Sequence, residues 1–115
     1  MAVYRATARR REAQAQQERE RRIRRAWVVA RQAASLLKER FGARQVVLYG
    51  SLARRDFFHR RSDIDLAVAG IAPRDFWRAW SALDRLDSRF EIDLMDMEDL
   101  SPALRLQIER EGVEL

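Results

Sequence analysis

The chain of 115 residues, 47% of them apolar and 36% charged, is long enough for one hydrophobic core and is typical of a single globular domain. It contains no cysteine, which excludes disulfide bonds and thiolate metal sites and is compatible with a reducing compartment. The N-terminus lacks the apolar segment of a signal peptide, and no apolar run approaches the roughly 18 residues of a membrane helix. We therefore expect a cytoplasmic protein without a membrane partner.

The positive charge is concentrated at the start of the chain. Residues 1–25 hold nine arginines and three glutamates, a net charge of +6, whereas residues 26–115 have a net charge of −1. Residues 1–22 are rich in Ala, Arg, Gln and Glu, which favour helix, but have few large apolar side chains. We expect 1–22 to be a basic helical arm in solvent and 23–115 to be the folded domain. A partner-binding arm is the alternative, while nucleic acid has only charge in its favour and is not the expected partner.

The folded domain is predicted to begin with a helix that ends before Gly42. Its apolar residues are spaced three and four apart and form one stripe: Ile23, Trp27, Ala30, Ala34, Leu37 and Phe41. Trp27 and Phe41 are expected to pack in the core rather than to contact a partner. A β-rich run over 45–49 then predicts a strand, which Gly50-Ser51 ends before a short helix over 52–58.

A second strand is predicted over 63–70 and a third over 89–97, with a helix between them that begins at Pro73. On the apolar face of that helix we expect both tryptophans in the core: Phe76, Trp77, Trp80, Leu83 and Leu86. Ser101 followed by Pro102 predicts the start of a last helix, and 112–115 a short terminal strand. This order predicts an α/β or α+β domain with helices against a small mixed sheet.

Aspartates interrupt the second and third strands, where ionised groups are unfavourable to bury without a partner or a metal. Asp63 and Asp65 are two residues apart, so they project to the same face of a strand. In the third strand, Asp93 lies between Ile92 and Leu94 and faces away from both. If the two strands are neighbours, Asp93 joins the other carboxylates. Three such oxygen donors suit Mg²⁺, which completes its ligands from water and substrate phosphates.

The turn Gly50-Ser51 provides a complementary phosphate site. Glycine lets the backbone approach a ligand closely, and the free N–H groups at the start of a helix attract anions. The Ser51 hydroxyl adds another donor. A phosphate-binding turn beside a metal site is the layout of metal-assisted nucleotidyl transfer. The alternative interpretation of the aspartates is a set of solvated carboxylates on an edge strand.

The segment LYGSLARRDFFHRRSDIDLAV, residues 48–68, resembles the signature of the minimal nucleotidyltransferases, small members of the DNA polymerase β-like superfamily. The ending IEREGVEL also resembles theirs, so the resemblance covers roughly residues 25–115. It implies the nucleotidyltransferase fold, similar to the polymerase β palm. By position it implies that Gly50 and Ser51 bind the triphosphate and that Asp63 and Asp65 bind Mg²⁺. It also implies that Asp93 helps to bind the metal and to deprotonate the attacking hydroxyl.

The loop between the turn and the aspartates departs from the family pattern in two respects. Members often have glycine where Arg55 stands, and the spacer here is one residue longer than the commonest form. Arg54 matches the arginine of the family motif, and it either contacts phosphate or supports Asp63 or Asp56. The other polar residues of the loop are expected to be in solvent: His59, Arg60 and Arg61. The alternatives are a phosphate-binding role for the two arginines and a catalytic role for His59.

The resemblance implies an enzyme that moves AMP from ATP to a hydroxyl of a partner. Larger relatives hold the acceptor with a second domain, but only residues 94–115 follow Asp93 here, so a partner protein or a second copy is expected to present it. The implied partner is a small helical HEPN-type toxin, which makes this chain the antitoxin of a pair. The alternative is a non-catalytic module that neutralises its partner by contact, with a vestigial nucleotide site.

Overall fold

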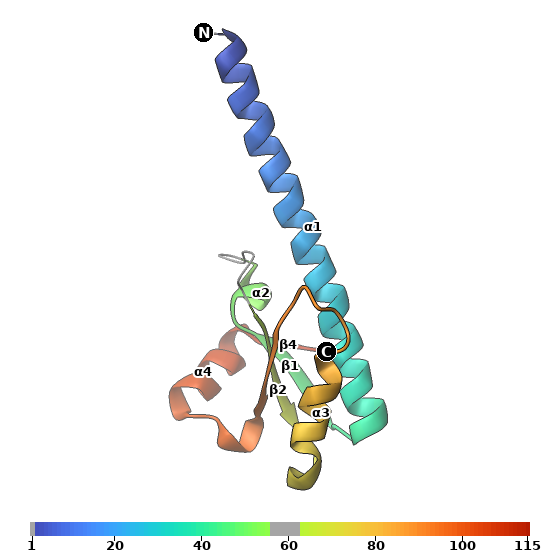
Figure 1. Ribbon diagram of the computed structural model, residues 1–115. Coiled ribbons are helices and arrows are strands. Elements are labelled where there is room, and N and C mark those ends of the chain that lie inside the picture. Colours follow the sequence, from blue (N-terminus) through green and yellow to red (C-terminus); the bar gives the residue numbers. More distant parts are fainter. Residues whose placement is uncertain (1, 56–62) are drawn as a thin grey trace.

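The computed structural model describes residues 2–55 and 63–115, and side chains from residue 4 onward within them (Figure 1). The elements in chain order are α1 (Ala2–Phe41), β1 (Gln45–Tyr49), α2 (Ser51–Arg54), β2 (Ile64–Ala69), the 3₁₀ helix η1 (Pro73–Asp75), α3 (Phe76–Leu83), β3 (Ile92–Asp96), the 3₁₀ helix η2 (Met97–Asp99), α4 (Pro102–Glu111) and β4 (Val113–Glu114). In the parts of the chain so described, no helix has both the length and the apolar composition needed to cross a membrane.

The four strands form one mixed sheet in the order β3-β2-β1-β4. β1 pairs antiparallel with β2 and with β4, whereas β2 and β3 run parallel and are joined by a crossover through η1 and α3. The two aspartate-bearing strands are therefore neighbours. The prediction of a small mixed sheet flanked by helices is confirmed.

The two faces of the sheet have different partners. One face packs against α1 and α3 and contributes these residues to the core: Val46, Leu48, Ile64, Leu66, Val68, Ile92 and Leu94. Because side chains alternate along a strand, Val47, Asp65 and Asp93 belong to the other face. α4 lies near this second face, since a Cβ added at Gly112 would come within 2.6 Å of the Val47 side chain.

α1 is one continuous helix through residue 22, and its second half forms one wall of the core. Its most buried residues are Ala26, Val29, Ala30, Ala33, Ala34 and Leu37, none of them more than 4% exposed. Four of these are alanines, whose small side chains let the helix approach the sheet closely. The apolar stripe predicted from spacing therefore only partly matches the buried face of the helix. Trp27 and Phe41 are only partly buried, at the margins of the core.

The end of α1 agrees with the prediction. Gly42 has a φ of 73°, in the left-handed region that glycine tolerates best. The Ala43 N–H donates to the Leu37 carbonyl at 3.1 Å, which satisfies one of the last free carbonyls of the helix. The predicted start of the last helix is also confirmed, because the Leu104 N–H donates to Ser101 Oγ at 3.2 Å.

The prediction that both tryptophans of α3 lie in the core was wrong for Trp77, which is 70% exposed. The helix turns its i, i+3, i+4 and i+7 positions to the sheet, beginning at Phe76, and Trp77 is one step off that face. Its ring stacks on Trp80 instead, with centroids 5.3 Å apart. Trp80 is partly buried, and its Nε1–H donates to the Ile92 carbonyl at 2.8 Å.

The remaining differences concern element boundaries. β2 is one residue shorter at each end than predicted, and β3 begins at Ile92 rather than at 89, because Asp87–Phe90 forms a hydrogen-bonded turn. The helix predicted over 52–58 is α2, which ends at Arg54 because Arg55 has a φ of 61°. Residues 56–62, which include Asp56, His59, Arg60 and Arg61, lie outside the described residues. The division of the chain at residue 22 stays a prediction.

Candidate functional site

Three polar side chains form a row across neighbouring strands on the face of the sheet opposite α1. The antiparallel register of β1 and β2 pairs Tyr49 with Asp65, and the parallel register of β2 and β3 pairs Asp65 with Asp93. Residues paired in this way lie on the same face with their Cβ atoms close together. Asp63 precedes β2 by one residue, two positions from Asp65. The structure therefore places the three predicted carboxylates at one end of β2 and β3.

Gly50 closes one side of this row, directly after β1. It has a φ of 79°, and a Cβ at this position would lie 2.3 Å from Asp65 Oδ2. That separation is far below any real contact, so the absence of a side chain at residue 50 is what lets the Asp65 carboxylate occupy its place. The predicted phosphate turn and the predicted metal ligands are therefore in direct contact.

Burial and crowding of negative charge perturb the ionisation of this row. The pKa of Asp65 is raised to about 6, first by its burial and then by the charges of Asp93 and Asp63, while the charge of Arg54 acts in the opposite direction. The pKa of Tyr49 is raised to about 12 by burial and by the same carboxylates, Asp65 and Asp93. Tyr49 therefore stays protonated near neutral pH, while Asp65 holds a proton more readily than an ordinary carboxyl.

α2 begins at Ser51, immediately after Gly50. The Arg54 N–H donates to the Gly50 carbonyl at 3.2 Å, so the N–H groups of residues 51–53 precede the first bond inside the helix. Arg54 Nη1 donates to Glu111 Oε2 at 3.1 Å, which links α2 to the end of α4. Arg54 was predicted to contact phosphate or to support an aspartate. Its charge does act on Asp65, and the ion pair with Glu111 was not foreseen.

Arg55 occupies the position where the resemblance to the minimal nucleotidyltransferases leads us to expect glycine. Its left-handed backbone fits that expectation, because a side chain with a Cβ is strained there by roughly 1–2 kcal/mol. The Arg55 guanidinium lies 5.5 Å from the centroid of the Trp27 ring, which ties the end of α2 to α1. This contact offsets part of the strain.

The donor set of the row fits a magnesium ion that is bound together with a nucleotide. Within residues 2–55 and 63–115, no three carboxylate or imidazole groups gather closely enough to chelate one ion by themselves. Mg²⁺, however, usually takes one or two carboxylates from the protein and the rest from water and substrate phosphates. Asp65 and Asp93 offer such a pair of hard oxygen donors, and a cation would relieve their repulsion.

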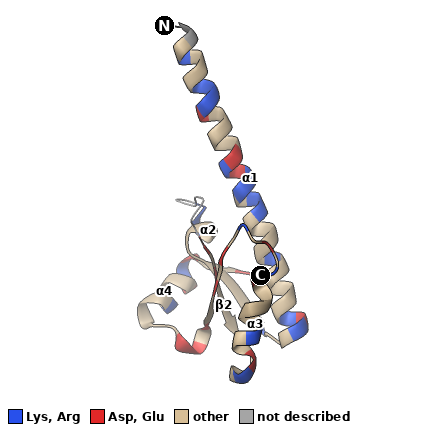
Figure 2. Cartoon of the chain, viewed as in Figure 1, with Lys and Arg blue, Asp and Glu red and all other residues tan. Residues whose placement is uncertain are grey.

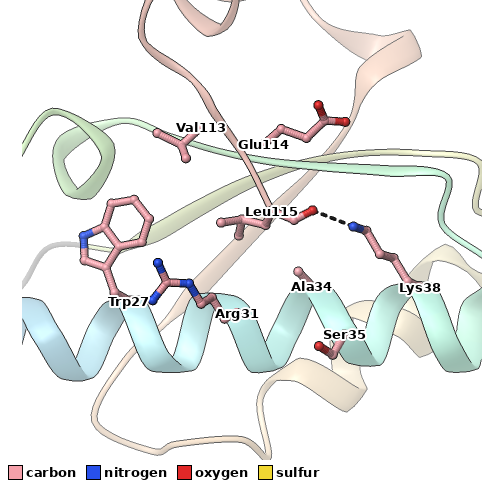
Figure 3. Close-up of a pocket in the computed structure, with 8 residues that line it drawn as sticks. All are labelled: Trp27, Arg31, Ala34, Ser35, Lys38, Val113, Glu114 and Leu115. Atoms are coloured by element: carbon pink, nitrogen blue, oxygen red, sulfur yellow. Dashed lines mark hydrogen bonds between the residues drawn. The ribbon is translucent and has the colours of Figure 1, made fainter.

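A separate groove of about 380 Å³ runs between α1 and β4 (Figure 3). Its lining includes Trp27, Arg31, Lys38 and Leu115, and the Lys38 ammonium donates to the Leu115 carbonyl oxygen. Val113, which also lines it, pairs with Leu48, whose side chain belongs to the helix-covered face of the sheet. The groove is therefore on the opposite face from Asp65 and Asp93, and we do not assign the nucleotide to it.

A Gly-Ser turn after one strand, in contact with paired carboxylates on the next two strands, defines the nucleotidyltransferase class of proteins. The chain belongs to the family described as polymerase beta, nucleotidyltransferase, whose model matches residues 31–115. A comparison with the sequences of curated proteins finds no significant match.

Solved structures agree with this assignment. A protein assigned as a minimal nucleotidyltransferase is 32% identical, with a TM-score of 0.66 over 81% of this chain and 95% of that chain. A toxin–antitoxin structure with AMP-PNP is 25% identical, with a TM-score of 0.62 over 74% of this chain and 70% of that chain. An MNT antitoxin in complex with tri-AMPylated HEPN toxin from Shewanella oneidensis is 20% identical, with a TM-score of 0.57 over 77% and 70%, and shows the fold alone.

The first prediction concerns the contact between Gly50 and Asp65. Gly50→Ala should destabilise the protein by about 3 kcal/mol or more, because it combines backbone strain with a clash. Gly42→Ala is the control for a positive φ alone, since its φ is 73° and nothing lies within 4 Å of the added Cβ, whereas Gly50, with a ψ of −155°, adds a backbone region open almost only to glycine to the clash. Denaturant unfolding of the two variants measures the difference. An equal decrease in the free energy of unfolding in both variants would show that the Asp65 carboxylate does not restrict the side chain at residue 50.

The second prediction concerns the pH dependence of stability without metal. With a folded-state pKa near 6 and an unfolded-state value near 3.8, Asp65 is protonated more readily in the folded protein, so its contribution to stability falls as pH rises through this interval. Asp65→Asn should therefore stabilise the protein at pH 8, by about 3 kcal/mol at most, and have little effect at pH 4.

Thermal unfolding across this pH range, with Asp84→Asn as an exposed control, provides the measurement. A stabilising effect of Asp65→Asn that is the same at pH 4 and pH 8 would contradict the raised pKa. Added Mg²⁺ should reduce the advantage of Asp65→Asn at pH 8, because a cation stabilises the ionised carboxylate of the unmodified protein.

Proposed function

We propose that this chain is a Mg²⁺-dependent nucleotidyltransferase that moves AMP from ATP to a hydroxyl of a partner protein, as the antitoxin of a HEPN/MNT toxin–antitoxin pair. The observation that carries the proposal is the register that places Asp65 beside Asp93 and in contact with Gly50. Family membership supports nucleotidyl transfer. Similar structures support the nucleotide and the partner, since one contains AMP-PNP and another a tri-AMPylated HEPN toxin.

The proposed nucleotide site uses the turn after β1. Gly50 leaves the backbone open to the triphosphate, Ser51 offers its hydroxyl and N–H, and Arg54 offers its positive charge. We assign Asp65 and Asp93 as the pair of ligands, and Asp63, two residues before Asp65, as the third residue that would hold Mg²⁺ together with a bound nucleotide. When bound, the ion supplies charge neutralisation for the phosphates and for the leaving group. In the structure, the hydrogen bond to Glu111 holds the Arg54 guanidinium.

Asp93 is the proposed proton acceptor for the attacking hydroxyl. As the acceptor oxygen forms its bond to the α-phosphorus, its proton passes to the Asp93 carboxylate, the bond from the α-phosphorus to the bridging oxygen breaks, and pyrophosphate leaves. Tyr49 is not the base, because the raised pKa keeps its phenol protonated. The acceptor in this proposal is a hydroxyl that a partner brings to the start of β3, where Asp93 lies.

The third prediction tests nucleotide binding and transfer separately. Calorimetry should detect ATP binding with Mg²⁺ and much weaker binding without it. Asp93→Asn should retain a fold of similar stability but lose transfer by roughly 10²-fold or more, because the amide cannot accept a proton. The control is Asp84→Asn, an exposed residue after α3. Transfer is measured as the mass of one adenylyl group added to a purified HEPN-type toxin that is incubated with this chain.

Two outcomes would contradict the proposal. Equal affinity for ATP with and without Mg²⁺ would exclude the metal role of the carboxylates. If Asp93→Asn, or the unmodified chain without ATP, neutralised the partner at the same stoichiometry, contact rather than chemistry would be the mechanism.

A further inference from the structure

The first half of α1 extends beyond the body of the domain. The sequence predicted an arm over residues 1–22, and from here on we use the name for residues 4–21. Every residue of this arm is exposed, whereas Ala26 and Val29, a few residues later, are fully buried. The molecule is elongated as a result, with extents of 62 × 30 × 18 Å (Figure 1). The match to the family model begins at residue 31, so the arm lies outside the part of the chain that matches the nucleotidyltransferase family.

The base of the arm is anchored to the segment that leads into the site. Arg25 Nε donates to Asp87 Oδ2 at 3.1 Å, and the Arg22 guanidinium lies 4.7 Å from the centroid of the Phe90 ring. Asp87 and Phe90 belong to the turn before β3, three to six residues before Asp93. The Asp87 side chain is only 6% exposed, and hydrogen bonds from Arg89 hold its pKa well below the usual range. The base of the arm is therefore tied to the turn before β3 by an ion pair and a cation–π contact.

The arm leaves the domain at the end of the sheet where the site residues lie. α1 runs antiparallel to β1, so its N-terminal half passes the end of β1 that carries Gly50 (Figure 1). Arg55, at the end of α2, contacts Trp27 just below the arm. The turn before β3 and the end of α2 both belong to this end of the sheet, and both touch α1 where the arm begins.

The arm also carries a net positive charge, which the body lacks. Residues 4–21 hold six arginines and three glutamates, a net charge of +3, and the whole segment 1–25 has +6 against −1 for the remainder; Figure 2 shows basic residues along the helix outside the body. No residue of the arm belongs to the core or packs against it, so core packing does not account for this part of α1. Its exposed basic surface is complementary to an acidic one.

We propose that the arm is the docking surface for the acceptor of the adenylyl transfer, and that it selects a protein with an acidic surface. This inference rests on the proposed function. Of the parts of the chain that the structure describes, the arm is the one that extends past the site beyond the sheet and its covering helices. Glu12, Glu18 and Glu20 among the arginines favour a protein, which presents both signs of charge, over a phosphate backbone, which presents only negative charge.

The test compares two triple variants of the full chain that change the charge equally. The arm variant is Arg9→Glu, Arg10→Glu and Arg11→Glu, and the control is Arg74→Glu, Arg78→Glu and Arg85→Glu, whose residues are exposed on and around α3. The probe is a fluorescent random copolymer of glutamate and tyrosine, which offers acidic surface and hydroxyls. Binding is measured by fluorescence anisotropy at two salt concentrations, and circular dichroism confirms that each variant is folded.

We expect the arm variant to bind the copolymer roughly ten-fold more weakly than the unmodified chain at low salt, and the control to change it by less than about three-fold. Adenylyl transfer to the copolymer should fall in parallel, while binding of ATP with Mg²⁺ stays the same in all three proteins. The calorimetric measurement separates the proposed function from the docking proposal. If the unmodified chain did not bind ATP with Mg²⁺, the proposed function would be overturned, but the comparison of copolymer binding between the two triple variants would still test the arm.

Two results would overturn the docking proposal. Equal weakening in both triple variants would attribute binding to net charge rather than to the arm. Tighter arm-dependent binding of a single-stranded RNA of matched charge than of the copolymer would make nucleic acid the occupant of the arm.

Discussion

The site depends on the contact between the Asp65 carboxylate and Gly50. Asp65 stands in a strand whose neighbours on the other face are fully buried, and its own side chain is partly buried between Tyr49 and Asp93. No residue with a side chain could occupy position 50 without displacing it. The end of β1, the start of α2 and the carboxylates of β2 and β3 are thereby held in one arrangement. Burial and repulsion raise the pKa of Asp65, and a perturbation of this kind in a row of polar residues is typical of a functional site.

Much of the fold could be predicted because its signals are local. Apolar runs bounded by Gly50-Ser51 and by Gly70 indicated strands, and Ser101-Pro102 indicated a helix start. The position of Trp77 could not be predicted from composition, because an eight-residue helix presents only one face to the sheet and neighbouring aromatic residues cannot all use it. The buried stripe of α1 was displaced toward its alanines, since close packing on a sheet favours small residues over Trp27.

The sequence predicted which residues form the candidate site, but not which of them lie next to one another in space. The spacing of Asp63 and Asp65 predicts a shared face, whereas the pairing of Asp65 with Asp93 depends on strand order, which no local signal specifies. Tyr49 was missed because its relation to the carboxylates appears only once the register of β1 and β2 is known. The hydrogen bond between Arg54 and Glu111 was missed for the same reason, because the two residues are far apart in the sequence and meet only in the folded chain.

The central claim is that a metal–nucleotide complex binds where Gly50, Asp65 and Asp93 meet. Mn²⁺ added with ATP to isotope-labelled protein tests it most directly, because the paramagnetic ion broadens the amide signals nearest to it. The account predicts that the signals of Gly50, Ser51, Asp65 and Asp93 broaden first, while those of Ser35 and Lys38, in the groove between α1 and β4, remain sharp. Broadening centred on that groove, or uniform weak broadening over the whole chain, would contradict the account.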